Sequence, residues 1–199
     1  FLIVLPRLRE VAKSQYPKLQ LLRSVVLMAA TCLLFLSISK VGLAEATAIM
    51  DINPVLITLG AFLFLGEKIG PRRILGIIAS LIGALIIIRP GTDVFTIYAV
   101  LPFIAAVCYT TYNLTTRFVG NRESPWTSLL YSALFGAVVF SCIVPFFWQP
   151  VSLFAAGLMV LLSLCGTFSQ LFLIRALAIS ESSLLAPFAY VGLIYATIW

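Results

Sequence analysis

A carboxylate and an amide lie within an apolar segment of the sequence. Asp51 is followed by Asn53 and Pro54 in a stretch of mostly apolar side chains. Because an ionised group inside a membrane span is costly, Asp51 is expected to face water or the interior of a helix bundle. Pro54 crowds the carbonyl of Met50 and cannot donate to it, which predicts a helix bend. Asp51 and Asn53 are predicted to bind a solute or a proton. The alternative is that Asp51 caps or bonds a neighbouring helix near the interface.

Two tyrosines and an amide occur together in a later apolar segment. Tyr109, Tyr112 and Asn113 lie three or four residues apart and would share one broad helix face. Aromatic faces bind organic solutes, especially cationic or heterocyclic ones, by stacking and cation–π contact. The segment is predicted to line a binding pocket; the alternative is an aromatic belt at the membrane interface. Further polar or helix-bending residues are predicted to line the same path, or else to hold helices together: Thr167, Gln170, Tyr190 and Pro187.

Residue types that support catalysis or metal binding are missing or scattered. The sequence has no histidine, and its four cysteines lie in separate apolar segments. Histidine is the commonest acid–base group and metal ligand, and metal ligands must lie close together. A glycine-rich phosphate loop is also missing. We therefore expect no enzyme activity, no catalytic residue, no metal site and no cofactor.

Hydropathy predicts the elements that position these residues. Of the 199 residues, 62% are hydrophobic and 10% are charged, and the mean hydropathy is +1.12. A bilayer core of about 30 Å needs about 20 apolar residues per helix, because no backbone group can stay unpaired in lipid. The sequence therefore predicts an all-α integral membrane protein, a bundle of several spans. Helices are expected at 21–43, 45–65, 73–89, 98–118, 126–147, 155–179 and from 182 onward.

The basic residues predict how these helices are oriented. Positive side chains near span ends are concentrated on the cytoplasmic side of a membrane. Of the 13 basic residues, only Lys40 and Arg89 lie at one set of helix ends; the other set holds Arg7, Arg9, Lys13, Lys18, Arg23, Lys68, Arg72, Arg73, Arg117, Arg122 and Arg175. The second set is expected to be cytoplasmic. The net charge of +6 thus reflects topology and not a nucleic-acid partner. Glu67 is interpreted as a structural charge that pairs with its basic neighbours Lys68, Arg72 and Arg73; the alternative is a site for a coupling ion.

A weak internal repeat suggests an inverted architecture. The shift along the chain that places Thr31 on Thr167 also places Glu45 on Glu181. Five predicted crossings separate the two glutamates, so equivalent points lie on opposite membrane faces. Inverted repeats are typical of transporters in which two halves rock around a central site. The alternative is a chance alignment of two apolar helices.

The order of motifs resembles a known transporter domain. A helix that begins with AEAT and contains a proline ends in LGEK, and the next helix begins with RR and reads GIIASLIGALIIIRPG. This pattern resembles the EamA domain of the drug/metabolite transporter superfamily, closely over residues 24–91 and more loosely over 98–199. The resemblance implies ten helices in two inverted repeats, with both termini cytoplasmic. We expect a fragment of such a protein: 1–91 would be an N-terminally truncated first repeat and 92–199 a C-terminally truncated second repeat.

The resemblance also implies a function. We expect a secondary active transporter that moves a small organic metabolite or drug across a bacterial inner membrane by alternating access. A proton taken up by Asp51, or exchange against another solute, would drive it. The family suggests amino acids, nucleotide-like metabolites such as S-adenosylmethionine, or amphipathic drugs as substrates. The expected partners are this small molecule and the lipid bilayer, without nucleic acid, and a homodimer is left open. The alternatives are a permease subunit that needs a separate ATPase and an integral-membrane enzyme that modifies lipids.

Overall fold

The computed structural model of the chain describes residues 13–67, 70–71, 74–76, 78–79, 82, 97–120, 122–147 and 152–189. Within these ranges every regular element is a helix and none is a strand. The predicted residues Arg72, Arg73 and Tyr190 lie outside the described residues, as does most of the helix predicted at 73–89. For the described part of the chain, the prediction of an all-α membrane protein with several spans is confirmed.

Five helical stretches of the described chain are long and apolar enough to cross a membrane. They are α2 (Pro17–Val41); α3 (Leu43–Met50) followed by α4 (Asn53–Leu65); the 3-10 helix η2 (Ile97–Ala99) followed by α6 (Val100–Gly120); α7 (Pro125–Ile143) followed by η3 (Val144–Phe146); and α8 (Leu153–Ile179). After α8 the chain forms the short α9 (Ser182–Leu185) and the 3-10 helix η4 (Ala186–Ala189). These stretches match the helices predicted over the same residues, with ends shifted by a few positions.

Local sequence explains several helix ends. Pro17 lies in the first turn of α2, where its missing N–H removes no helical hydrogen bond. At the start of α7, the hydroxyl of Ser124 accepts a hydrogen bond from the Trp126 backbone N–H. Gly66 ends α4 with a φ of 67°, a left-handed conformation open to glycine without a Cβ clash. Helix α2 begins at Pro17, ahead of the predicted start at residue 21, so Arg23 lies farther inside the helix than predicted.

The second span is interrupted near its middle. Helix α3 ends at Met50, and α4 begins at Asn53 with Pro54 in its first turn. Asp51 and Ile52 form the turn between the two helices. The bend predicted at Pro54 falls on this junction, which places Asp51 at a helix end and not within a continuous helix.

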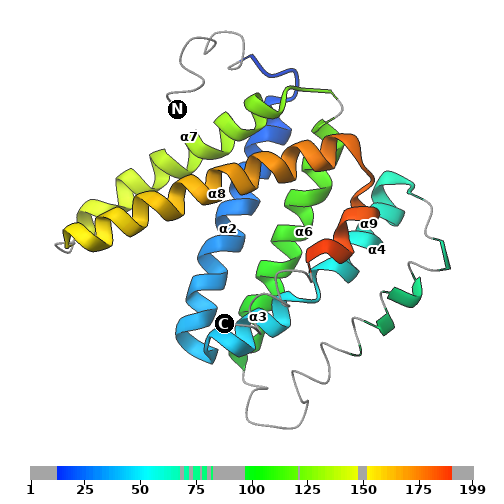
Figure 1. Ribbon diagram of the computed structural model, residues 1–199, viewed down its shortest axis with the longest axis horizontal. Helices are drawn as coiled ribbons and strands as arrows, with labels where there is room; N and C mark the ends of the chain where they lie inside the picture. Colours follow the sequence, from blue (N-terminus) through cyan, green and yellow to red (C-terminus); the bar gives the residue numbers. More distant parts are fainter. Residues whose placement is uncertain are drawn as a thin grey trace.

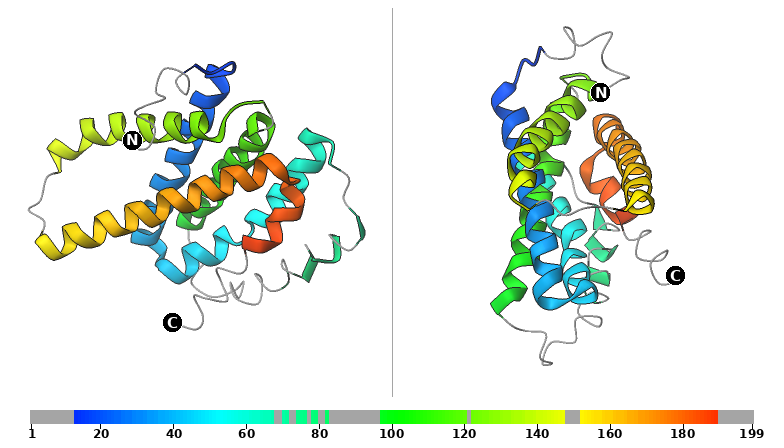
Figure 2. Two further views of the ribbon diagram at one scale, coloured as in Figure 1. Left: turned by 45° about the horizontal axis from the view of Figure 1, so that its top comes forward. Right: turned by 90° about the vertical axis from the view of Figure 1, so that its left-hand side faces the viewer.

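The helices form two layers that cross at an angle. Helices α2 and α6 pack along each other, and α3 and α4 lie against α6 (Figure 1). Helix α8 crosses the first layer, and α9 packs against α4, so α8 and α9 form a second layer (Figure 2). Helices α7 and α8 extend together beyond α2 (Figure 1), and most of their apolar side chains are exposed. In a membrane these side chains would contact lipid or further helices.

Charged residues from distant segments meet at one end of the bundle. The start of α2 contacts the loop before α7, since Ser14 hydrogen-bonds Glu123. At the same end, Glu67 after α4 pairs with Arg117 near the end of α6. Lys40 lies at the opposite end of α2, beside the ring of Tyr98. The described helices therefore place their basic ends as the charge pattern predicts for the cytoplasmic side.

Candidate functional site

A fully buried cation lies between three helices. Arg23 of α2 has no exposed surface. Its Nη1 donates to Thr116 Oγ1 of α6 at 3.3 Å. Its Nη2 donates to the Ser128 carbonyl and, at 2.9 Å, to Ser132 Oγ, both on α7. Among the residues that the structure describes, no carboxylate forms an ion pair with this guanidinium. Arg23 is thus hydrogen-bonded to neutral acceptors, an arrangement that the sequence analysis missed because it grouped Arg23 with the basic residues at the helix ends.

The buried cation contacts the predicted aromatic segment. The guanidinium carbon of Arg23 lies 5.4 Å from the centroid of the Tyr112 ring, within cation–π range. Tyr112 is almost fully buried, and its Oη donates to Gln170 Oε1 of α8 at 3.0 Å. Tyr109 stacks on Tyr112 with a centroid separation of 6.0 Å. Tyr112 therefore links α2, α6 and α8, and it packs inside the bundle and not at an interface belt.

Replacing Tyr112 with phenylalanine should show how much the hydrogen bond between Tyr112 and Gln170 contributes to stability. The change keeps the ring and removes only the hydroxyl that bonds Gln170, so we expect a loss of about 1 kcal/mol of unfolding free energy. Unfolding in mixed detergent micelles would measure it. In a double-mutant cycle with Gln170→Leu, the two losses should not add, because each variant breaks the same hydrogen bond. Fully additive losses would show that the hydrogen bond contributes nothing.

Part of the predicted binding segment lines a cavity. A cavity of about 290 Å³ is lined by Tyr109 and Asn113 of α6. The remaining walls come from α4, α8, α9 and η4, and include Ile57, Ser169 and Ser182. Asn113 is buried, and its Nδ2 donates to the Tyr109 carbonyl at 2.8 Å, which leaves the amide oxygen as an acceptor. The cavity thus combines a phenol, an amide and hydroxyls with apolar walls, as pockets for small organic molecules do.

Other predicted residues lie outside the lining of this cavity. Asn53 is buried and accepts a hydrogen bond from Thr110 Oγ1 at 3.4 Å, which joins α4 to α6. Asp51 is half-buried at the junction of α3 and α4. Thr167 is exposed and its hydroxyl donates to the Ser163 carbonyl of its own helix. Gln170 does not line the cavity and is connected to Tyr109 and Asn113 through its hydrogen bond to Tyr112. The structure therefore brings together Tyr109, Tyr112, Asn113 and Gln170, and leaves the Asp51 region and Thr167 apart from them.

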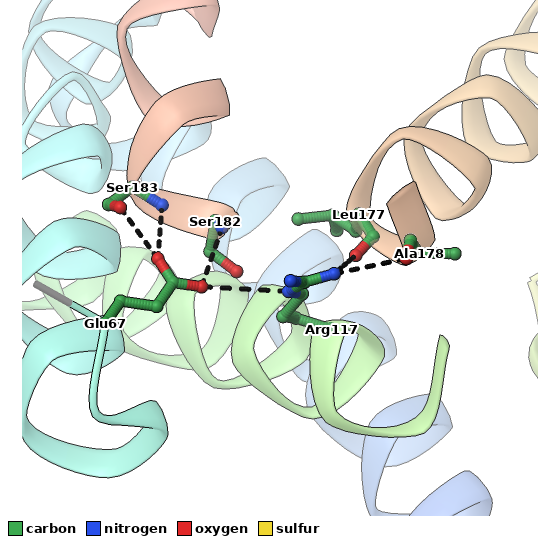
Figure 3. A network of polar contacts seen from close by, with 6 residues as sticks. All are labelled: Glu67, Arg117, Leu177, Ala178, Ser182 and Ser183. Atoms are coloured by element: carbon green, nitrogen blue, oxygen red, sulfur yellow. Dashed lines mark hydrogen bonds and ion pairs between the residues drawn. The ribbon is translucent and has the colours of Figure 1, made fainter. Parts of the chain in front are cut away.

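A second polar cluster surrounds Glu67 (Figure 3). The Glu67 carboxylate lies 3.7 Å from Arg117 Nε, and it accepts hydrogen bonds from the backbone N–H groups of Ser182 and Ser183. Sequence analysis expected partners among the neighbouring basic residues Arg72 and Arg73, which lie outside the described residues. The partner that the structure places on Glu67 is Arg117, which belongs to a different helix much later in the chain.

Glu123 holds the start of α2 to the loop before α7. It accepts hydrogen bonds from Ser14 Oγ at 2.6 Å, the Tyr16 backbone N–H at 2.9 Å and Gln20 Nε2 at 2.5 Å. Partial burial by itself would raise the pKa of this carboxyl, but the hydrogen bonds to its charged form outweigh burial and hold the pKa below its usual value. The carboxylate therefore stabilises the fold only while it is ionised.

The stability of the protein should consequently depend on Glu123 at neutral pH and not at low pH. A carboxyl whose pKa is lowered by folding contributes stability above its unfolded-state pKa, about 4.3, and loses that contribution as the pH falls toward the folded-state pKa. We expect Glu123→Gln to unfold at a lower temperature than wild type at pH 7, with a smaller difference near pH 3.5. Thermal unfolding in detergent at both pH values tests this. An equal difference at both would contradict it.

The described residues contain no candidate metal-binding site. No group of three or more acidic, cysteine or histidine side chains lies close enough there to hold a metal ion. The four cysteines are free thiols on separate helices.

Comparison with known proteins relates part of this chain to a family of transporters. Residues 1–89 match the EamA-like transporter family. The family resemblance drawn from the sequence motifs is thus confirmed, and the described helices make the chain a multi-pass membrane protein. No solved structure matches it.

Several curated transporters are similar to this chain. A riboflavin transporter of Brucella anthropi is 33% identical over 107 residues, which is 54% of this chain and 38% of that protein. A pseudopaline exporter of Pseudomonas aeruginosa is 27% identical over 83% of this chain and 59% of its own length. An S-adenosylmethionine uptake transporter of Rickettsia prowazekii is 24% identical over 94% of this chain and 63% of its own length. The chain thus spans less than two thirds of the length of each of these relatives.

Proposed function

We propose that this chain forms the central part of a secondary active transporter that moves a small organic metabolite across a bacterial inner membrane by alternating access. The observation that carries the proposal is the cavity between α4, α6, α8 and α9, in which the polar groups Tyr109, Asn113 and Ser169 lie among mostly apolar lining residues. In a membrane-spanning bundle such groups are costly unless they serve a solute path or hold helices together.

The positions of the helices support an inverted repeat. Helix α2 begins at Pro17 and helix α8 begins at Leu153. The number of residues between these two positions equals the number between Glu45 and Glu181 in the sequence repeat. Each of the two helices is followed within three residues by the start of another helix. The two helices begin at opposite ends of the bundle, because the start of α2 and the end of α8 lie at the basic end. Paired elements of opposite orientation are the basis of alternating access.

The relatives suggest the substrate class. They are named for riboflavin, pseudopaline and S-adenosylmethionine, which are organic molecules rich in hydrogen-bonding groups. The cavity offers the matching chemistry, since its phenol and amide can stack on and hydrogen-bond to a planar or polar solute. We propose a metabolite of this class, moved by exchange or with a proton bound at Asp51.

Counterflow in proteoliposomes tests the proposal. Proteoliposomes that contain the complete gene product would be loaded with unlabelled riboflavin, S-adenosylmethionine or amino acids and exposed to the labelled solute. Saturable uptake of one of them, competed by its unlabelled form, is the expected result. A matched Asn113→Leu variant should raise the half-saturating concentration, because it replaces the cavity amide with an apolar side chain of similar size. Failure of a demonstrably folded protein to take up any solute would contradict the proposal.

A further inference from the structure

The contacts of Glu67 join two parts of the chain that lie in different proposed repeats. Its carboxylate accepts hydrogen bonds from Ser182 N at 3.0 Å, Ser183 N at 3.1 Å and Ser183 Oγ at 2.7 Å. Glu67 follows α4 in the first repeat, whereas both serines begin α9 in the second. One carboxylate therefore holds the end of α4 against the beginning of α9 (Figure 3).

Arg117 extends this connection to α8. Its Nη1 donates to the carbonyls of Leu177 and Ala178 at 2.9 and 3.2 Å, while its Nε faces the Glu67 carboxylate at 3.7 Å. The ion pair lies largely inside the protein, since the side chains of Arg117 and Glu67 are 18% and 8% exposed, so water screens it only in part. We call the contacts of Glu67 and Arg117 with the end of α8 and the start of α9 the latch.

The latch lies directly at one end of the cavity. Leu177 and Ser182 line the cavity, and both belong to the latch, one through its carbonyl and the other through its N–H. The latch also lies at the basic end of the bundle, beside Arg122. Gly120 allows the close approach there, because a Cβ at this position would lie 3.1 Å from the Ala178 Cα.

We propose that the latch is the gate that closes the solute path at the basic, cytoplasmic end. This inference rests on the proposed carrier function and assigns the gate to particular residues. In the described conformation the gate is closed. Opening requires Glu67 to leave Ser182, Ser183 and Arg117, which separates the end of α4 from α9 while Arg117 keeps its bonds to α8. The contacts that break when the gate opens are therefore those of Glu67, which connects the first proposed repeat to the second.

Thiol labelling tests the gate without any substrate. In the complete gene product with its native cysteines replaced by serine, Ile57→Cys places one thiol in the cavity, where Ile57 is 6% exposed. A membrane-impermeant maleimide is then added from the cytoplasmic side. We expect Glu67→Gln and Arg117→Gln each to raise the labelling rate about fivefold or more, because each removes one charge of the closed gate. The double variant should label no faster than the faster single variant, since both break one latch.

Controls separate opening from unfolding and from failure of the carrier proposal. Glu123→Gln is the matched control, because it also changes a hydrogen-bonded carboxylate at the basic end but lies outside the latch. It should leave the labelling rate unchanged. If the latch variants fail to fold, Ser183→Ala removes the hydroxyl bond to Glu67, keeps both latch charges and should still raise the rate. Unchanged labelling in folded latch variants overturns the gate, even where transport is normal. Faster labelling without transport of any solute supports the gate and overturns the carrier.

Discussion

Replacing Arg23 with alanine is expected to destabilise the protein by about 3 kcal/mol, whereas methionine should cost less than about 1 kcal/mol. Arg23 is the largest fully buried side chain of the described residues. Truncation to alanine leaves a cavity in the centre of the bundle, and cavities of this kind cost several kcal/mol because the surroundings collapse only in part. Methionine fills most of the volume and removes the charge.

The methionine variant should lose little stability because the hydrogen-bond partners of Arg23 keep other hydrogen bonds when the guanidinium is absent. Thr116 Oγ1 also donates to the Tyr112 carbonyl at 2.6 Å, and Ser132 Oγ donates to the Ser128 carbonyl at 3.2 Å. Both hydroxyls therefore keep a hydrogen bond within their own helix when the guanidinium is removed. No carboxylate in the described part of the chain forms an ion pair with Arg23, and Glu123 attracts its charge only from farther away. Removal of the guanidinium therefore leaves no directly paired carboxylate buried without its partner, which is the usual source of a large penalty.

Unfolding in detergent micelles would measure both Arg23 variants, with Arg23→Lys as a third. Lysine keeps the charge but lacks the planar fork that reaches two helices, so it should fall between methionine and alanine. If methionine destabilises as much as alanine, the polar bonds and not the packing of Arg23 hold the three helices together. Counterflow with the methionine variant then measures whether the buried charge serves transport.

Replacing Asp51 with asparagine is expected to abolish proton-driven accumulation while solute exchange continues. Asparagine keeps the shape and hydrogen bonding of the side chain but cannot take up a proton. Asp51 lies at the turn between α3 and α4, so a proton site there interrupts no continuous helix. A pH gradient should then raise internal solute no further than the external concentration.

Uptake with and without a pH gradient, in the same proteoliposomes, separates the two activities. Glu45→Gln is the matched control, since Glu45 is a half-buried carboxylate in the first turn of α3 and should leave accumulation intact. Loss of both exchange and accumulation in a folded Asp51→Asn would assign Asp51 to solute binding. Normal accumulation would make Asp51 a structural residue that bonds a neighbouring helix.

The sequence alone predicted the spans and their orientation, because both depend on local properties. A backbone in lipid must pair its own polar groups, so the length of an apolar segment determines a helix that crosses the membrane. Orientation follows from the basic residues at the helix ends. The close spacing of Tyr109, Tyr112 and Asn113 predicted a polar interior face, although it could not separate Tyr112, which contacts α2 and α8, from the residues that line the cavity.

Only the tertiary structure decided which of these groups meet. Glu67 hydrogen-bonds serines 115 and 116 residues away, and Arg23 bonds a threonine 93 residues away. Such contacts depend on the crossing of α8 over α6 and on the packing of α2 against α6. Hydropathy does not encode this packing, because it indicates which segments cross the membrane and not which helices pack together. Sequence patterns therefore grouped Arg23 with the basic residues at the helix ends and paired Glu67 with Arg72 and Arg73, which lie outside the described residues. Helix packing buried Arg23 inside the bundle and placed Glu67 against Arg117 and α9.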